Sequence, residues 1–324
     1  MPASPALSVV VPTHNRSDRL RRLLAALATQ DVQSPFEVIV VDDGSTDATP
    51  AELEKLVEDF PFLRTIRVEP NGGPAAARNR GWRAATAPLV AFTDDDCIPD
   101  QGWVRGIADG LARADVVQGC TRADQSMVRE HGPFGHAVEV LAETGFYETC
   151  NMGYRRATIE SLGGFDETFR HPFGEDTDLA WRAKGDGFRV AFAPNAIVVH
   201  EVVKSDFVRY VRGLRRIEGV VLALQRHPGL RANYTMGIFF TEAHPRALAL
   251  VAAGTAIAAR PRGPLRWLAL AGCGWWYAKA AMRVRHYPAR RRDWAWVLPL
   301  AGVADVCEIA VLARASLRYR TFFL

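Results

Sequence analysis

The sequence has few cysteines and none of the cysteine patterns that mark disulfide scaffolds or zinc ribbons. Five cysteines occur among 324 residues, with no Cys-x-x-Cys pair and no metal-ligand spacing, and two of them lie in strongly apolar segments. Internal repeats and low-complexity tracts are also missing, and no basic stretch followed by an apolar stretch precedes the first predicted strand. These absences favour a reducing compartment and predict no secretory signal.

An uninterrupted apolar run of membrane-spanning length is missing as well. Apolar stretches occur at about 247–259, 265–282 and 294–315, but each is short or interrupted, the last by Asp305 and Glu308. A membrane-spanning helix needs about 20 apolar residues. We therefore expect these stretches to lie on a membrane rather than to cross it, and a helical hairpin through the bilayer stays open as an alternative.

Strands and helices alternate through the first two hundred residues. The strand in "VVPTHNR" contains the β-branched run Val9–Val11, which predicts burial on both faces, and it is expected to end at Pro12 because proline cannot donate to the ladder. Apolar residues at helical spacing follow over 17–30. Further strands are predicted at 36–41, 63–69 and 88–99, around helices that begin near residues 45 and 73. This alternation predicts a doubly wound, mostly parallel sheet.

Acidic residues follow two of these strands. "VDDGSTD" puts Asp43 at a strand end, where its carboxylate can bind a base or sugar, although a polar turn has the same composition. "FTDDDCIP" crowds Asp94, Asp95 and Asp96, and a divalent cation, Mg²⁺ or Mn²⁺, would neutralise their repulsion. The alternative is a solvated acidic turn.

Three further sites carry candidate side chains. Glu175, Asp176 and Asp178 stand at the start of a predicted helix, which suits either a general base or a helix cap. His200 closes the strand "AIVVH" as a metal ligand or as a half-buried histidine. Arg78 lies on the third helix, where it can reach a diphosphate or simply be solvated.

The C-terminal third is apolar and basic. The formal net charge is only +4, but arginines concentrate in "RVRHYPARRRD", and an amphipathic helix with arginines beside its apolar stripe is predicted over 207–226. With Trp294 and Trp296 close by, these features favour an anionic membrane surface over nucleic acid. We expect monotopic attachment to the cytoplasmic face of the cell membrane. A soluble helical subdomain or a homodimer interface that buries the same residues is the alternative.

Taken in order, "VVPTHNR", "VDDGSTD", "GGPAAARNRG", "FTDDDC" and "GEDTDLAWR" resemble the family 2 glycosyltransferases of the GT-A fold over residues 7–201. The resemblance implies a Rossmann-like α/β domain, expected over 1–204, before a mainly α-helical, membrane-associated region at 205–324. It implies an inverting, metal-dependent enzyme that moves one sugar from a nucleotide-sugar donor to a lipid-linked or saccharide acceptor in cell-envelope polysaccharide or glycolipid synthesis. The QxxRW motif of processive members is absent, which favours the addition of a single sugar.

The resemblance also implies roles for individual residues. Nucleotide-sugar contacts fall on Pro12, His14, Asp43, Arg78, Asp94 and Asp95, the Mn²⁺ or Mg²⁺ ligands on Asp96 and His200, and the catalytic base on Asp176.

Two other functions are weighed against this one. A sugar-phosphate nucleotidyltransferase needs a glycine- and lysine-rich loop after the first strand, and residues 11–20 contain neither. A catalytically silent membrane- or glycan-binding scaffold would not need Asp43, Asp94, Asp96 and Asp176 together.

Overall fold

The computed structural model describes residues 4–32, 34–127, 132–136, 138–169, 171–259, 265–284 and 293–324. The chain divides into two compact units. The first comprises Met1–Asp124 and Ala137–Glu201, and the second comprises Gln125–His136 and Val202–Leu324. Gln125–His136, which lies inside the first predicted domain, therefore groups with the second unit.

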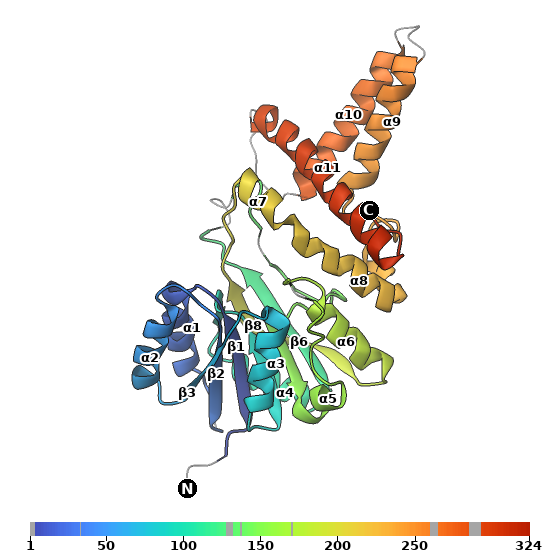
Figure 1. Cartoon of the computed structure of the whole chain (residues 1–324). Coiled ribbons are helices and arrows are strands. Elements are labelled where there is room, and N and C mark those ends of the chain that lie inside the picture. The colour runs from blue at the N-terminus through green and yellow to red at the C-terminus, as the bar shows by residue number, and fades with distance from the viewer. Residues whose placement is uncertain are drawn as a thin grey trace. The chain divides into compact units, whose positions relative to one another are not determined.

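An eight-stranded sheet forms the centre of the first unit, in the order β3-β2-β1-β4-β7-β6-β8-β5 (Figure 1). Its strands are β1 (Leu7–Thr13), β2 (Phe36–Asp43), β3 (Leu63–Val68), β4 (Leu89–Thr93), β5 (Cys97–Pro99), β6 (Val116–Ala123), β7 (Asn151–Arg155) and β8 (Val190–His200). Pairing is parallel from β3 through β2 and β1 to β4, and again between β6 and β8, whereas β7 and β5 are antiparallel to their neighbours. The predicted mostly parallel sheet is confirmed.

Helices cover both faces of this sheet. They are α1 (Ser17–Ala28), α2 (Thr49–Asp59), α3 (Pro74–Ala84), α4 (Trp103–Leu111), α5 (Arg156–Ser161) and α6 (Glu175–Gly185). One buried cluster joins α1, α2 and α4 to Val9 and Val11, and a second joins α3, α5 and α6 to Val10. Because successive side chains of a strand point to opposite faces, three consecutive valines serve both cores.

The central strand β1 continues one residue past Pro12, where the sequence predicts its end. Pro12 lies opposite Val41 of β2, while pairing with β4 stops at Val10, opposite Phe92. A proline removes only its own N–H donor, so the strand tolerates it where one neighbouring strand has already ended.

The pairing of β6 with β8 contains a shift in register, which affects the course of β8 toward its end. Pairing of β6 with β8 shifts between Gly119 and Cys120. The side chain of Asn151 of β7 bonds to β6 at this shift. Its Nδ2 donates to the carbonyl of Cys120 at 2.9 Å, and its Oδ1 accepts from Trp103 Nε1 at 2.8 Å. A Cβ at position 119 would lie 2.3 Å from Asn151 Oδ1, so only glycine fits there. Irregularities of this kind bend a strand, and β8 ends at the candidate metal ligand His200.

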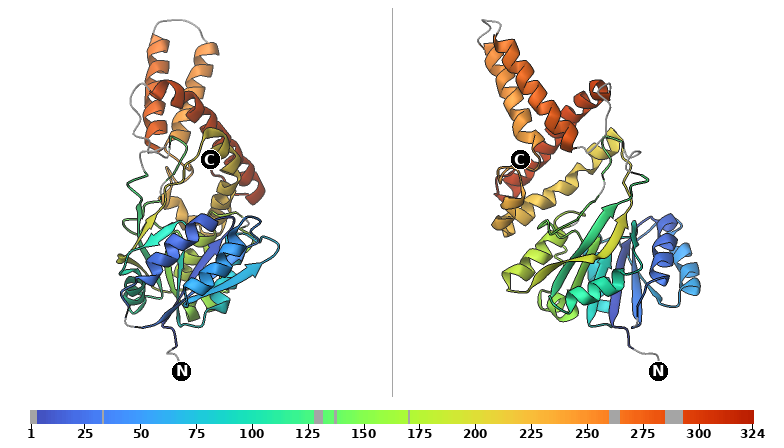
Figure 2. Two further views of the ribbon diagram at one scale, coloured as in Figure 1. Left: turned by 90° about the vertical axis from the view of Figure 1, so that its left-hand side faces the viewer. Right: turned by 180° about the vertical axis from the view of Figure 1, so that it is seen from behind.

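The described part of the second unit is mainly helical. It contains α7 (Phe207–Gly213), the 3₁₀ turn η1 (Leu214–Ile217), α8 (Glu218–Arg226), the 3₁₀ turn η2 (Pro228–Asn233), α9 (Ala243–Ala259), α10 (Leu265–Val284) and α11 (Trp294–Tyr319). Helices α9 and α10 lie side by side, as Figure 2 shows from two further sides, and α11 packs against α8, α9 and α10.

The amphipathic helix predicted over 207–226 is divided into α7, η1 and α8. Leu214, Ile217, Val221 and Leu224 of its apolar stripe are buried, and α11 packs against η1 and α8. Protein therefore covers these four residues, as in the alternative of a helical subdomain that buries them, and attachment of the unit to a membrane stays a prediction. Most of "RVRHYPARRRD" lies outside the described residues.

Helix α11 is longer than the sequence analysis expects. Its 26 residues have a mean hydropathy of 1.8 over the most apolar window. At about 1.5 Å per residue they are long enough for a bilayer core of about 30 Å. The expectation that every apolar stretch is too short or too interrupted to cross a membrane is therefore wrong for α11 by length and composition. Asp305 and Glu308 do not interrupt the helix, and both are buried inside the unit.

Candidate active site

Asp43 ends β2 and holds the loop that leads into α3. Its Oδ1 accepts a hydrogen bond from the N–H of Gly72 at 2.9 Å, and its Oδ2 accepts one from the N–H of Gly73 at 2.8 Å. Gly73 has a φ of 86°, which favours glycine, and it directly precedes Pro74, the first residue of α3. Carboxylate oxygens have further lone pairs, so Asp43 can still accept from a ligand hydroxyl.

The carbonyl of Asp43 fixes two side chains at the same edge of the sheet. His14 is exposed, and its Nδ1 donates to this carbonyl at 2.8 Å. Asn71 Nδ2 donates to it as well, also at 2.8 Å. Pro12 is half-buried near the end of β1. Three of the residues predicted to contact the nucleotide thus belong to two adjacent strand ends.

Asp95 is the most enclosed of the three consecutive aspartates. Its Oδ2 accepts a hydrogen bond from Thr13 Oγ1 at 2.7 Å, which links the ends of β1 and β4. Arg16 Nη1 lies 3.7 Å from its Oδ1. Burial, followed by the charge of Asp96, raises the pKa of Asp95 to about 7 despite the guanidinium of Arg16. The crowding expected from the sequence thus adds to the effect of burial on this pKa.

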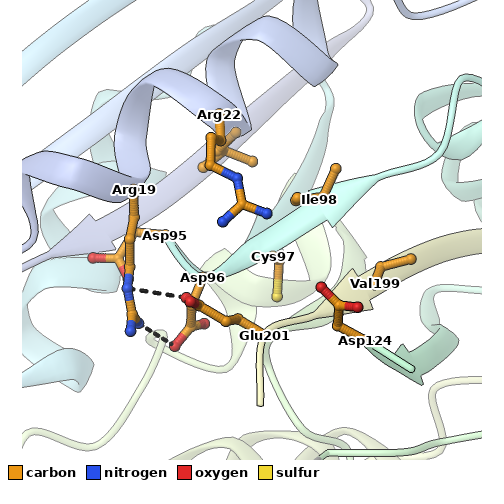
Figure 3. Close-up of a pocket in the computed structure, with 10 residues that line it drawn as sticks. Arg19, Arg22, Asp95, Asp96, Cys97, Ile98, Asp124, Val199 and Glu201 are labelled. Carbon is orange, nitrogen blue, oxygen red and sulfur yellow. Dashed lines mark hydrogen bonds and ion pairs between the residues drawn. The ribbon is translucent and has the colours of Figure 1, made fainter. Parts of the chain in front are cut away.

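Two arginines of the β1–α1 segment contact Asp96. Its Oδ2 lies 3.4 Å from Arg16 Nη1 and 3.2 Å from Arg19 Nη1. Figure 3 shows Arg19 reaching both Asp96 and Glu201, whose Oε2 is 3.0 Å from Arg19 Nε. Arg19, Asp96 and Glu201 are among the residues that line a cavity of about 10 Å³, which is room for about one water molecule. Sequence reasoning missed Arg19 because helix arginines are usually solvated, and it assigned no contact to Arg16, which directly precedes α1.

His200 presents one nitrogen to Asp96. Its Nδ1 donates to the carbonyl of Glu201 at 2.7 Å, since a carbonyl can only accept, so in the neutral ring Nε2 carries the lone pair, and it lies 3.5 Å from Asp96 Oδ1. That oxygen is buried and has no hydrogen-bond partner among the described residues. A metal-binding histidine is held in the same way, by a hydrogen bond from its other ring nitrogen. The pair therefore fits a divalent cation.

Cys97 joins the same group in space. One ligand atom each of Asp96, Cys97 and His200 lies within 4.8 Å of the others. Burial raises the pKa of the Cys97 thiol, so without a cation it stays protonated and is a weaker ligand than the other two. Sequence reasoning missed Cys97 because its partner His200 is distant in the chain.

Arg78 lies buried between carboxylates. Its Nη2 is 2.9 Å from Asp94 Oδ1, and its Nη1 is 2.8 Å from Glu175 Oε1. Burial alone would lower the pKa of Arg78, but Asp94, Glu175 and Asp176 outweigh it, and the pKa lies above its ordinary value. Arg78 therefore ties the end of β4 to the start of α6. Its predicted contact with a diphosphate stays a prediction.

Asp176 is the second residue of α6. Its Oδ1 accepts from the N–H of Thr177 at 2.8 Å, and its Oδ2 accepts from the N–H of Thr149 at 3.3 Å. Burial raises the pKa of Asp176, while Arg78 opposes the rise. A raised pKa makes the carboxylate a stronger base at neutral pH. Asp178 has a different environment, because its Oδ2 pairs with Arg182 at 2.9 Å.

Glu148 is a further acidic residue beside Asp176 that the sequence analysis missed. Its Oε2 accepts from Gln118 Nε2 at 2.8 Å. Burial, with a smaller contribution from Asp176, raises the pKa of Glu148 to about 7. No local sequence motif identifies Glu148, because the residues that surround it, Gln118 of β6 and Asp176 of α6, are distant in the chain.

Proteins of known structure share this fold. The chain superposes on a mannosyltransferase from Pyrobaculum calidifontis, solved in complex with GDP-Man and Mn²⁺, with a TM-score of 0.52 and 21% identity over 98% of this chain and 83% of that one. The predicted GT-A fold is confirmed.

Sequence comparison gives the family. The model described as Glycosyl transferase family 2 matches residues 8–164, and that described as Glycosyl transferase family group 2 matches residues 89–307. The chain belongs to the family 2 glycosyltransferases.

Two curated relatives match the chain in part. It is 33% identical over 215 residues to a pre-mycofactocin glycosyltransferase of Mycobacterium tuberculosis, covering 62% of this chain and 43% of the relative. It is 32% identical over 222 residues to a validoxylamine A glucosyltransferase of Streptomyces hygroscopicus subsp. jinggangensis, covering 56% of this chain and 52% of that relative. The chain thus spans about half the length of these relatives.

Glu148→Gln should stabilise the protein at high pH only. The pKa of Glu148 rises from an ordinary 4.5 to about 7 in the folded protein. Its contribution to stability is therefore complete below about pH 4.5 and is lost as pH rises through about 7, where the charge must be buried. We expect the melting temperature of Glu148→Gln to match the unmutated chain at pH 5 and to exceed it at pH 8.

Glu160→Gln on α5 is the control, since Glu160 is exposed. Its difference in melting temperature from the unmutated chain should be the same at both pH values. A Glu148→Gln difference that is also independent of pH would contradict the raised pKa.

Proposed function

We propose that the chain is an inverting glycosyltransferase that moves a single sugar from a nucleotide-sugar donor to a hydroxyl of a lipid-linked or saccharide acceptor. The observation that carries the proposal is the link that Arg78 makes between Asp94, at the end of β4, and Glu175, beside Asp176. This link couples the acidic strand end to the helix start that bears the candidate base. Burying these charged side chains costs desolvation free energy. A catalytically silent scaffold has no need to place charges there, whereas an active site does.

The donor is assigned to the edge formed by the ends of β1, β2 and β4. Pro12, His14 and Asp43 are proposed to contact the base and ribose, and Asp95 the ribose. Support comes from the hydrogen bond that joins His14 to the carbonyl of Asp43 and from the bond of Gly72 that holds the Asp43 carboxylate. Asp94 and Arg78 are proposed to lie on the diphosphate side.

Asp96 and His200 are proposed to hold a divalent cation, Mn²⁺ or Mg²⁺. The unpartnered Asp96 Oδ1 and the lone pair of His200 Nε2 support this assignment. A cation bound there would stabilise the negative charge of the departing nucleoside diphosphate. Arg16 and Arg19, which now contact Asp96, add fixed positive charge near the same place.

Asp176 is proposed to act as the general base. Its carboxylate takes the proton of the acceptor hydroxyl while that oxygen forms a bond to the anomeric carbon of the sugar. The bond from this carbon to the phosphate oxygen breaks, and its electron pair leaves with the nucleoside diphosphate. Attack from the side opposite the leaving group inverts the anomeric centre. Thr149 and Thr177 hold Asp176 through main-chain N–H groups.

The second unit is proposed to attach the enzyme to the cytoplasmic face of the cell membrane, where a lipid-linked acceptor is available. Exposed apolar side chains support this, and they gather on its last three helices: Leu248, Val251, Trp267, Leu268, Trp275, Trp276, Trp296, Val303, Val306 and Leu317. Tryptophans favour the depth of the lipid headgroups. Attachment through α11 as a spanning helix and a homodimer interface are the alternatives.

Asp96→Ala should abolish cation-dependent binding of the donor and leave the fold intact, because the substitution relieves a crowded acidic cluster. Calorimetric titration with UDP, GDP and dTDP, with and without Mn²⁺, measures this. Asp100→Ala, an exposed residue four positions along the chain, is the control. Unchanged dependence on Mn²⁺ in Asp96→Ala would show that the metal is bound elsewhere.

Asp176→Asn should keep donor binding and lose turnover by at least about 10²-fold, which is typical of the removal of a general base. The side-chain volume is nearly preserved and only the basicity is lost. A screen of nucleotide sugars for donor hydrolysis first identifies the substrate, and initial rates then compare the variant with Asp186→Asn, an exposed residue after α6. Turnover close to that of the unmutated chain would leave Asp176 with a capping role only.

Replacing Val251 and Leu268 by aspartate should move the full chain from the membrane fraction to the soluble fraction. Both side chains are more than half exposed, at 61% and 69%, so the fold should tolerate the change. Val57→Asp on α2 is the control, since Val57 is an exposed apolar residue of the first unit. If the unmutated chain itself stays soluble in high salt without detergent, membrane attachment is refuted and the homodimer interface takes its place.

A further inference from the structure

Three side chains of metal-ligating type meet inside the second unit. His244 comes from α9, and Asp305 and Glu308 come from α11; their exposed fractions are 0%, 1% and 2%. One ligand atom of each lies within 4.8 Å of the others. In the sequence the two acidic residues only interrupt an apolar stretch, and nothing connects them to His244.

The spacing along α11 explains how two carboxylates reach one place. Asp305 and Glu308 are three residues apart, and side chains at that spacing lie on the same face of a helix. This face packs toward α9, since α9 and α11 are in contact, and His244 is the second residue of α9. The group is thus built by two packed helices rather than by a mobile surface loop.

A tyrosine hydroxyl holds one oxygen of each carboxylate. Tyr277 of α10 donates to Asp305 Oδ2 at 2.7 Å, and Tyr210 of α7 donates to Glu308 Oε1 at 2.5 Å. The second oxygen of Glu308, Oε2, lies 2.9 Å from His244 Nε2. Outer hydrogen bonds that orient ligating carboxylates in this way are typical of protein metal sites.

Only one of the two ring nitrogens of His244 has a hydrogen-bond partner among the described residues. Its Nδ1 is buried and has no hydrogen-bond partner among the residues that the structure describes. A buried polar atom without a partner costs free energy, so a hydrogen-bonded network alone does not account for a histidine here. A cation bound between His244 and Glu308 would replace the proton on Nε2, which faces Glu308 Oε2, and the ring would then carry its proton on Nδ1.

We propose that His244, Asp305 and Glu308 bind one first-row divalent cation, with Zn²⁺ as the preferred ion. One imidazole and two carboxylates suit such cations, and Zn²⁺ binds nitrogen and oxygen ligands more tightly than Mn²⁺. Zinc bonds of about 2.0–2.2 Å require about 3.4 Å between ligand atoms, so separations of up to 4.8 Å close with small side-chain shifts. The cation would join α9 to α11 and is independent of the proposed sugar transfer.

The test uses the full chain in detergent, without a polyhistidine tag, and in an Asp96→Ala background that disables the proposed donor-site metal. The protein is treated with a chelator, dialysed and titrated with Zn²⁺, and with Co²⁺ for its absorption spectrum. We expect one zinc ion per chain and a rise in melting temperature on its addition. His244→Ala and Glu308→Gln should weaken binding at least 10-fold, and Tyr277→Phe by about 10–100-fold, as for other outer-shell partners.

Glu242→Gln is the matched control, because Glu242 is a half-buried carboxylate just before α9 that pairs with Arg246 and Arg283 instead. It should bind zinc as the background does. No zinc binding by the background, or binding that His244→Ala and Glu308→Gln leave unchanged, would mean that the three residues form a hydrogen-bonded network only. If His244→Ala does not fold, the removal and return of zinc in the background decides the question without it.

Discussion

Crowding of negative charge at one edge of the sheet is the constraint on which the rest of the first unit depends. Parallel strands bring their carboxyl ends together, and here those ends carry aspartates that repel one another. Two arginines offset this charge: buried Arg78 lies between Asp94 and Glu175, and half-buried Arg19 contacts Asp96 and Glu201. The positions of α1, α3 and α6 are thereby coupled to the acidic edge through ion pairs as well as through the apolar cores.

The arginines do not fully stabilise the ionised carboxylates at this edge, and a bound ligand could add to that stabilisation. The carboxyls of Asp95, Glu148 and Glu175 have pKa values raised to about 7, because burial outweighs their favourable contacts. A cationic ligand or a hydroxyl donor entering the site would relieve part of this strain. A purely structural acidic turn would instead face solvent and keep its ordinary pKa.

The second unit has buried polar side chains beside its apolar core and exposed apolar side chains on its surface. Carboxylates, a histidine and tyrosine hydroxyls lie inside it, while tryptophans, leucines and valines remain exposed on α9, α10 and α11. Exposed apolar surface favours a lipid or protein partner, and the buried polar group fixes how the helices pack. Residues such as Asp305, which look like breaks in a membrane segment, are therefore part of the internal framework.

The sequence by itself determined the alternating strands and helices, the GT-A fold and the set of acidic strand ends, because these follow from local periodicity and from motifs of a few residues. Even there it placed the end of β1 too early, since the pairing of Pro12 depends on where β4 stops. Tertiary structure alone decided that Arg78 is enclosed by two carboxylates, that Cys97 joins His200, and that α11 covers the apolar stripe of α8. Each of these depends on contacts between residues distant in the chain, and no local pattern records which distant side chain will occupy the low-dielectric space beside a given residue.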